Sequence, residues 1–569
     1  MERPPQRINP EAAAAALLVL VLLAYLPALG AGFIWDDDDH VTENPTLRTV
    51  DGLRRIWLEI GAVPQYYPVV HTTFWIEYRL WGLAPLGYHL TNVLLHALSA
   101  ILLWCLLRRL AIPGAWLAAA VFALHPVHVE SVAWVTERKN VLSAAFYLAA
   151  AHAWLSFRPL DGDRPAVRET WRGYAAVVAL FLGALLSKTV TATFPAAMLL
   201  IVWWKTGRVP RRQILPAAPL LAVGAAMGVL TAWMERSVVG AAGGAWDLTF
   251  AERLLVAGRA AWFYAAKLVW PRPLIFIYPR WPIDAGSAAQ YLPPIAAASV
   301  LVLLWAMRGR IGRAPLAGSL FFVGTLFPAL GFLNVYPMRY SFVADHFQYL
   351  ASLGVLVPVV GCAAASIPDR GPWHRSAPVL GAALLAVLGA LTLRQSAVYS
   401  DPETLWRDTL AKNPGAFSAH NNLGALLLAR GDTREAREHF EQAARIAPDA
   451  PEAYDNLGIV LHEEGRYAEA IELYRKALDL DPLFADAHNN LAITLAAVGK
   501  LDEAVFQFEE AIRARPSFAR ARYNLGLALL RLGRADAAFS ALAEAARYDP
   551  ADPDIARARE EAAARRSRP

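Results

Sequence analysis

Residues 415–448 read GAFSAHNNLGALLLARGDTREAREHFEQAARIAP, and residues 449–482 read DAPEAYDNLGIVLHEEGRYAEAIELYRKALDLDP. The same pattern runs on through two more copies of 34 residues, so that four copies fill residues 415–550. A proline ends each copy, and a leucine recurs at equivalent positions, which are Leu423, Leu457, Leu491 and Leu525. A fixed period of this length predicts a solenoid that stacks one repeated supersecondary unit.

Small residues recur inside each copy where two helices would cross. Gly424, Gly458 and Gly526 share one position, with Ala492 in their place in the third copy, and Gly431 and its equivalents suit the end of a first helix. This pattern resembles the tetratricopeptide repeat, whose unit is a pair of antiparallel helices. Residues 399–414 resemble a degenerate half-repeat or linker, and residues 551–569 form a charged C-terminal tail.

An asparagine occupies the same position in the first helix of every copy. Asparagine is a mediocre helix former, so helix propensity does not select it. Its amide offers both a donor and an acceptor, which suits the backbone of an extended polypeptide. The series resembles the asparagine ladder in the repeats of the O-GlcNAc transferase and predicts acceptor-peptide binding. The alternative is that the amides satisfy contacts between neighbouring repeats. The residues are Asn422, Asn456, Asn490 and Asn524.

The first 398 residues are dominated by long apolar runs. Of the 569 residues, 56% are hydrophobic and 18% charged, and the charged ones gather in loops and in the C-terminal third. Since a helical span needs about 20 apolar residues, we expect an all-α fold, a polytopic membrane helix bundle at 1–398 followed by the solenoid. Residues 252–270 carry three basic side chains and are expected to lie at the membrane interface. The predicted spans, about eleven in number, are 12–32 (a retained signal anchor), 87–107, 113–128, 140–157, 173–187, 190–204, 213–233, 291–307, 315–333, 349–366 and 376–393.

Basic residues alternate between the two sides of these predicted spans. Clusters such as 205–212 and 308–313 fall on one side, which the positive-inside rule makes cytoplasmic together with the N-terminus. The loops 33–66, 129–139 and 334–348 then lie on the opposite face, and an odd span count places the repeats there too. The Ala- and Arg-rich composition favours a bacterial inner membrane, with a periplasmic face, over the endoplasmic reticulum and its lumen.

Four consecutive carboxylates follow the first span, in the stretch Phe33-Ile-Trp-Asp-Asp-Asp-Asp-His40. Crowded carboxylates require cations, a metal or a shared proton, and one of them can act as a general base on a hydroxyl. The alternative is a solvated acidic loop that helps to set the topology.

A Phe-x-x-Asp-Asp segment directly after the first span resembles the type C glycosyltransferases. The order and spacing of five segments, together with the trailing repeats, resemble more closely the transmembrane and tetratricopeptide-repeat O-mannosyltransferases. The resemblance implies that Asp36 or Asp37 is the catalytic base and that His128 and Glu130 position sugar or acceptor hydroxyls. The five segments are 33–45, 66–96, 125–142, 186–195 and 344–354.

A lipid-phosphate sugar donor would need cations to stabilise its departing phosphate. Lys188 is the most informative candidate, because a lone cation on the non-cytoplasmic side opposes the usual bias. Its alternative role is snorkelling or an ion pair. At the position of His346, related sequences tend to carry arginine. The candidates are Arg138, Lys139, Lys188, Arg339 and His346.

No metal site is predicted. His125 and His128 are three residues apart, but Pro126 intervenes and no third ligand is evident. The two cysteines, Cys105 and Cys362, lie in apolar runs and give no disulfide framework or zinc site. No cofactor is certain, and a divalent-metal requirement stays open.

These features favour a membrane glycosyltransferase that moves a monosaccharide, by resemblance mannose, from a polyprenyl-phosphate carrier to Ser or Thr hydroxyls of exported proteins. Its expected partners are the lipid-linked donor, an extended acceptor polypeptide or protein, and membrane lipid. The net charge of +5 gives no case for nucleic acid, since membrane topology explains most loop Arg and Lys. One alternative is a membrane scaffold whose repeats recruit protein partners. Another is a transporter, but neither mid-membrane charges nor symmetric halves are seen.

Overall fold

The computed structural model describes residues 9–160, 171–241, 243, 246–368, 372–550 and 552–566. These residues contain helices and no strand, which confirms the all-α prediction. The chain forms two compact units, Met1–Asn413 and Pro414–Pro569. Helix α17 (Pro402–Lys412), which falls in the predicted half-repeat, therefore belongs to the first unit.

The first unit is a bundle whose helices begin at recognisable signals. Asn9 caps α1 through its side chain, Pro85 opens α5, and Thr249 and Glu252 form a capping box at α12. The helices before α17 are α1 (Pro10–Ala24), α2 (Leu26–Leu29), α3 (Val50–Leu58), α4 (Pro68–Trp81), α5 (Pro85–Arg109), α6 (Ala115–Leu124), α7 (Val129–Ala133), α8 (Arg138–Phe157), α9 (Trp171–Leu185), α10 (Phe194–Thr206), α11 (Arg211–Ser237), α12 (Phe250–Val269), α13 (Leu292–Met307), α14 (Ala314–Leu326), α15 (Leu353–Ala365) and α16 (Pro372–Ser396).

Four helices among the described residues are long and apolar enough to cross a membrane: Pro85–Arg109, Arg211–Ser237, Ala288–Met307 and Arg375–Tyr399. A fifth span results if α6 and the helix after it, which are bent by 52°, count as one. The other predicted spans coincide with helices that are shorter, broken or less apolar, so the count of eleven stays a prediction. The predicted interfacial helix is α12.

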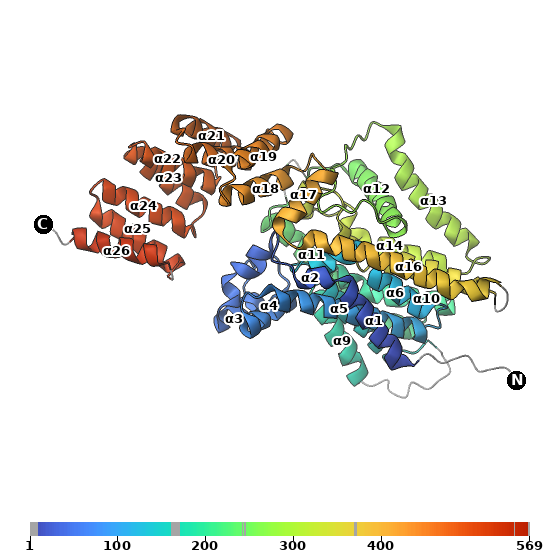
Figure 1. Cartoon of the computed structure of the whole chain (residues 1–569). Coiled ribbons are helices and arrows are strands. Elements are labelled where there is room, and N and C mark those ends of the chain that lie inside the picture. Colours follow the sequence, from blue (N-terminus) through green and yellow to red (C-terminus); the bar gives the residue numbers. More distant parts are fainter. Residues whose placement is uncertain are drawn as a thin grey trace. The chain divides into compact units, whose positions relative to one another are not determined.

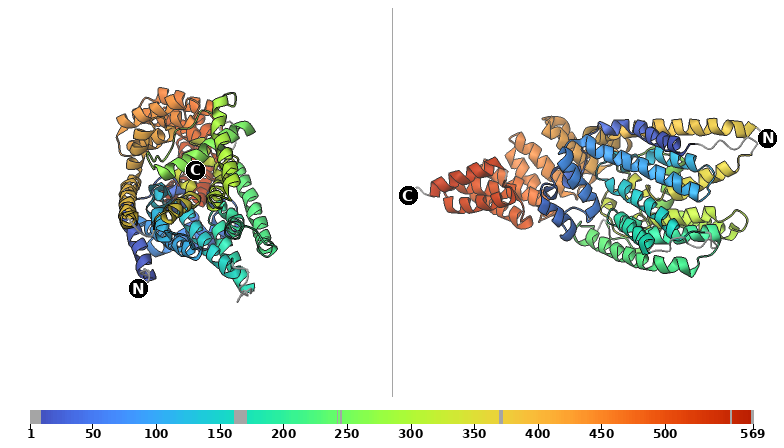
Figure 2. Two further views of the ribbon diagram at one scale, coloured as in Figure 1. Left: turned by 90° about the vertical axis from the view of Figure 1, so that its right-hand side faces the viewer. Right: turned by 90° about the horizontal axis from the view of Figure 1, so that it is seen from below.

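The bundle packs around α5 and α8, which contact each other. α5 lies beside α1 in the bundle (Figure 1). α1 lies beside α5, α6 and α16, and the long helices run roughly side by side when seen from below (Figure 2, right). α14 and α15 cross at two glycines: a Cβ at Gly318 would lie 2.4 Å from the carbonyl oxygen of Gly354. Only glycine permits this approach of the two backbones.

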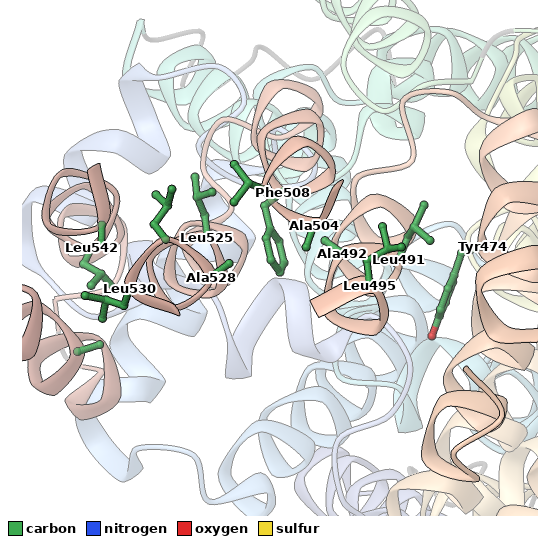
Figure 3. Close-up of a cluster of buried hydrophobic side chains, with 14 of the residues drawn as sticks. Tyr474, Leu491, Ala492, Leu495, Ala504, Phe508, Leu525, Ala528, Leu530 and Leu542 are labelled. Carbon is green, nitrogen blue, oxygen red and sulfur yellow. The ribbon is translucent and has the colours of Figure 1, made fainter. Parts of the chain in front are cut away.

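The second unit is the predicted solenoid of helix pairs, followed by one further helix. Each pair packs an aromatic or leucine side chain against a small residue, as Phe440 does against Gly424. The second to fourth pairs and the last helix share one apolar core (Figure 3). Its helices are α18 (Phe417–Ala429), α19 (Thr433–Ile446), α20 (Pro451–Glu463), α21 (Tyr467–Leu480), α22 (Ala485–Ala497), α23 (Leu501–Ala514), α24 (Ala519–Arg531), α25 (Ala535–Tyr548) and α26 (Pro553–Arg566).

Most of the predicted charged tail is this last helix. α26 buries Ile555, Ala558 and Ala562, and packs on α25. Its charged residues occupy the remaining faces, as expected of a helix that covers the open end of a solenoid.

Candidate active site

The acidic stretch lies in a tight turn at the end of α2. Trp35 has φ +50°, a conformation rare for a residue with a large side chain, and Asp38–Thr42 form a single π-helical turn. Such strained and bulged backbone gathers at functional sites. The turn directs the first two carboxylates into different environments.

Asp37 points into the protein and is saturated with hydrogen bonds. Its Oδ2 accepts from the backbone N–H of Ile34 at 2.9 Å. Its Oδ1 accepts from the backbone N–H and the hydroxyl of Thr136, at 2.8 and 2.6 Å. Burial raises the pKa of Asp37 to about 7 although these bonds favour the ionised form. Asp37 therefore fastens the acidic turn to the segment before α8.

Asp36 borders a large cavity instead. Its side chain is 28% exposed, and its Oδ1 is buried with no hydrogen-bond partner among the described residues. Burial raises the pKa of Asp36 to about 8, while the nearby charge of Lys139 opposes that rise. A carboxylate with an unsatisfied oxygen and a raised pKa is suited to take a proton from a bound hydroxyl.

The cavity has a volume of about 540 Å³. Segments far apart in the sequence meet around it: the acidic turn, the start of α8, the turn after α9, the end of α11, and the segments 276–277 and 335–351. Its polar lining includes Asp36, Asp39, His40, Gln65, Glu130, Glu137, Lys139, Asn140, Lys188, Glu235 and His346.

One carboxylate, Glu137, organises the cationic wall of the cavity. Its oxygens lie 2.9 Å from Nζ of Lys139, 3.5 Å from Nζ of Lys188 and 3.8 Å from Nε2 of His346. Burial alone would raise the pKa of Glu137, but the charges of His346, Lys139 and Lys188 outweigh it and hold the pKa well below its usual range. Glu137 is therefore an anion that holds two lysines and an imidazole close together.

Lys188 has a second partner in this wall. Its Nζ donates to Oδ1 of Asn140 at 2.6 Å. Burial lowers the pKa of Lys188 to about 8, against the pull of Glu137. Sequence reasoning did not single out Glu137 or Asn140. An acid directly before Arg138 and Lys139, in a segment with few charges, was the available signal for Glu137.

Glu130 and His346 form a second close contact of the cavity. The Glu130 carboxylate accepts from the backbone N–H of His346 at 3.0 Å and contacts its Nδ1 at 2.9 Å. Both side chains are buried. The bond fixes the imidazole so that Nε2 faces Glu137.

A separate apolar groove of about 300 Å³ lies near this cavity. Three elements contribute residues to both the cavity and the groove, and on each of them these residues are about one helical turn apart. Ser143, Thr325 and Leu350 line the cavity, whereas Tyr147, Phe321 and Leu353 line the groove. The groove walls are almost wholly apolar, with leucine, alanine and glycine prominent.

Comparisons with known proteins agree with the two-unit layout. A family model described as tetratricopeptide repeat matches residues 415–483 and 449–517, and a second matches residues 489–554. Protein O-mannosyl-transferase F38B6.6 of Caenorhabditis elegans is 26% identical over 451 residues, covering 76% of this chain and 62% of that one. Protein O-mannosyl-transferase TMTC1 of Homo sapiens is 24% identical over 513 residues, covering 79% of this chain and 57% of that one. The chain is a relative of the transmembrane and tetratricopeptide-repeat protein O-mannosyl-transferases.

Shorter stretches give higher identity. Protein O-mannosyl-transferase Tmtc1 of Drosophila melanogaster is 33% identical over 186 residues, which cover 31% of this chain and 21% of that one. The chain thus spans less than two thirds of the length of the mannosyltransferase relatives it matches. Among solved structures, MamA is 24% identical with a TM-score of 0.24, covering 26% of this chain and 86% of that chain.

Four of the residues predicted to handle the donor line the cavity: Lys139, Lys188, His346 and Glu130. His128 lies outside that lining. Its Nδ1 bonds the carbonyl of Phe122 at 2.8 Å and its Nε2 the hydroxyl of Ser352 at 3.0 Å. Its role in this structure is to join neighbouring helices.

Arg138 and Arg339 also lie outside the cavity lining. The guanidinium of Arg138 is buried against Glu77 at 2.6 Å and also donates to Asn92 and to the carbonyl of Tyr88. It clamps α4, α5 and α8 together. Arg339 lies over the ring of Tyr340, which itself borders the cavity.

The arrangement of the possible metal ligands can be compared with that of a metal site. Within the described ranges, no three His, Cys, Asp or Glu side chains converge as metal ligands would. The oxygen-rich cavity holds its acidic groups against cations of the protein itself, as Glu137 and Glu130 show.

The asparagine ladder lies in the second unit, where its amides meet their neighbours. Nδ2 of Asn456 donates to Oδ1 of Asn421 at 3.0 Å, and Nδ2 of Asn524 donates to Oδ1 of Asn489 at 3.0 Å. Asn490 donates to Asp455, and Asn422 to the carbonyl of Ser418. These donors link adjacent repeats or neighbouring turns, as the alternative interpretation expects, and peptide binding by the ladder stays a prediction.

Proposed function

We propose that this chain is a membrane glycosyltransferase that moves mannose from a polyprenyl-phosphate carrier to Ser or Thr hydroxyls of exported proteins. The reaction takes place at the non-cytoplasmic face, with the repeats on that side, and the composition favours a bacterial inner membrane. The names of the mannosyltransferase relatives support this choice of sugar and of acceptor.

The observation that carries the proposal is a charged cavity with an apolar groove about one helical turn away from it on three elements. The cavity places a carboxylate, Asp36, across from the cations Lys139 and Lys188, and α8, α14 and α15 form part of the wall of the groove. An amphiphile with an anionic head and a long hydrocarbon tail matches both regions at once. A soluble nucleotide sugar would leave the apolar groove without a use.

The mechanism follows from these positions. Asp36 removes the proton of the acceptor hydroxyl, whose oxygen forms a bond to the anomeric carbon. The bond between that carbon and the phosphate oxygen breaks, and the phosphate departs with both bonding electrons. Lys139, Lys188 and His346 stabilise the charge it gains. One displacement of this kind inverts the anomeric centre.

A second candidate is a non-enzymatic scaffold, which the four repeats favour because such solenoids commonly bind protein partners. In that case the cavity carboxylates would serve only stability. Replacement of Asp36 or Lys188 would then leave the biological role intact.

Transfer of radiolabelled mannose from polyprenyl-phosphate-mannose to membrane proteins distinguishes the two. We expect wild type to label protein and Asp36→Asn to lose about a hundredfold or more, the typical contribution of a general base. Asp38→Asn is the matched control, because Asp38 is an exposed neighbour outside the cavity lining. Equal loss in both variants would remove Asp36 from the mechanism.

The donor and acceptor are tested with the same membranes. No transfer by wild type from a panel of lipid-linked sugars would put the scaffold first. Label that reaches lipid or glycan, but not protein, would keep the enzyme class and overturn the acceptor.

A further inference from the structure

A pair of buried histidines stands directly behind Asp36. Nε2 of His40 lies 3.8 Å from Oδ2 of Asp36, and Nδ1 of His40 lies 3.2 Å from Nε2 of His71. Nδ1 of His71 lies 3.1 Å from the carbonyl oxygen of Tyr67. The three side chains form a line from the cavity into the protein.

The last contact fixes the protons of both rings. A backbone carbonyl only accepts, so Nδ1 of His71 must carry the proton and donate it. In a neutral imidazole the other nitrogen is then an acceptor, so Nε2 of His71 receives a hydrogen bond from Nδ1–H of His40. Nε2 of His40 is consequently unprotonated, and its lone pair faces Asp36.

Both rings are held neutral by their surroundings. Burial lowers the pKa of His71 to about 4. Burial, followed by the neighbouring His71 and Lys139, places the pKa of His40 well below its usual value, with Glu137 acting in the opposite direction. The charged groups that face Asp36 itself are Lys139, Asp37 and Glu137.

We propose that His40 is a positioning residue that accepts a hydrogen bond from protonated Asp36 and thereby strengthens Asp36 as a base. When Asp36 is ionised, two lone pairs face each other, and the separation of 3.8 Å is too long for a hydrogen bond. When Asp36 takes the proton of the acceptor hydroxyl, its new O–H closes on Nε2 of His40. The proton stays on Asp36 until it passes to solvent or to the departed phosphate.

This polarity is the reverse of a catalytic triad, in which histidine donates to the carboxylate. Here the imidazole favours the protonated carboxyl, because a hydrogen bond to the neutral form disfavours the charged one. The inference rests on the proposed function, since it assigns Asp36 the role of base.

His40→Asn isolates the effect. The asparagine amide takes the place of Nδ1–H and keeps the donor to His71, while the atom that faces Asp36 is removed. We expect the rising limb of kcat against pH to move about one unit lower, and kcat on its plateau to fall about three- to tenfold as the base weakens. KM for the donor should not change. A rising limb that stays in place would overturn the proposal.

A spectroscopic readout decides the geometry whatever the enzyme transfers. In nitrogen-15 spectra of histidine-labelled full-length protein, the signals lost in His40→Asn and in His71→Asn identify the two rings. We expect both to be neutral with Nδ1 protonated. A proton on Nε2 of His40 would overturn the proposal, whereas failure of mannose transfer by wild type with the expected tautomers would reject only the proposed function.

Discussion

At the scale of residues, two adjacent carboxylates carry different tasks because one turn of backbone separates their environments. Asp37 accepts three hydrogen bonds, while Asp36 keeps an unsatisfied oxygen at the cavity. The proposed chemistry is therefore assigned to Asp36, whereas Asp37 holds the loop in place.

The division predicts opposite effects of the same substitution. Asp37→Asn turns one accepting oxygen into a donor that faces N–H or O–H groups, so we expect a loss of about 1–3 kcal/mol in the free energy of unfolding. Asp36→Asn should leave stability unchanged or raise it, because Oδ1 of Asp36 makes no hydrogen bond that the substitution would break and the amide has no charge to desolvate. Thermal unfolding of both purified variants in the same lipid environment checks this. A greater loss for Asp36→Asn would contradict the division.

The pH dependence follows from two groups of the cavity. Burial raises the pKa of Asp36 to about 8 and lowers that of Lys188 to about 8. Asp36 acts when ionised, so activity rises with pH, and Lys188 acts when protonated, so activity falls at higher pH. We expect the plot of kcat/KM against pH to be a narrow bell-shaped curve with its maximum near pH 8.

Lys188→Arg tests the assignment of the falling limb. A guanidinium stays charged throughout this range, so the fall should disappear while the rise remains. Persistence of the fall in this variant would assign it to another group.

The acidic pair and four residues of the cavity lining were singled out from the sequence alone, because a charged residue next to an apolar run is recognisable without a structure. It could not separate Asp36 from Asp37, since the turn at Trp35 decides which one faces the cavity. Arg138 shows the converse: a basic residue suited to a phosphate is buried against Glu77, a partner 61 positions away in the chain.

At the scale of elements, the crossing of α14 and α15 shapes the groove. A Cβ at Gly354 would lie 2.5 Å from the carbonyl oxygen of Gly318 and 2.7 Å from the backbone nitrogen of Phe322. Both neighbours are backbone atoms, so the helices must separate to admit a side chain.

Gly354→Ala should therefore destabilise the protein by about 1–3 kcal/mol and raise KM for a long-chain donor. Gly324→Ala is the control on α14, because a Cβ there meets no atom within 4 Å. Thermal unfolding and donor kinetics measure the two effects. If KM rises equally for a donor with a short chain, the groove does not hold the tail.

Element prediction succeeded for helix type and failed to settle the span count. Hydropathy locates each apolar run, but the bend of 52° after α6 and the short α9 and α10 depend on packing that no local window contains. The same packing turned the predicted tail into α26, whose buried face is three small or branched residues.

At the scale of the whole molecule, the chain joins a unit with a charged cavity to a unit of repeats. The repeat period alone predicted the second unit, because its contacts are between neighbours. The cavity of the first unit could not be predicted from the sequence, because its lining comes from segments between residues 35 and 351. The proposed division of work is chemistry in the first unit and capture of the acceptor in the second.

Asn456 separates capture from simple stability. Its amide donates to Asn421, so Asn456→Ala and Asn421→Ala both break the same bond between repeats. Each should lower the stability of the solenoid by about 0.5–1.5 kcal/mol. If the ladder holds the acceptor backbone, only Asn456→Ala should raise KM for a long polypeptide acceptor. Neither variant should change kcat for a short peptide acceptor. Equal KM changes in the two variants would reduce the ladder to a contact between repeats.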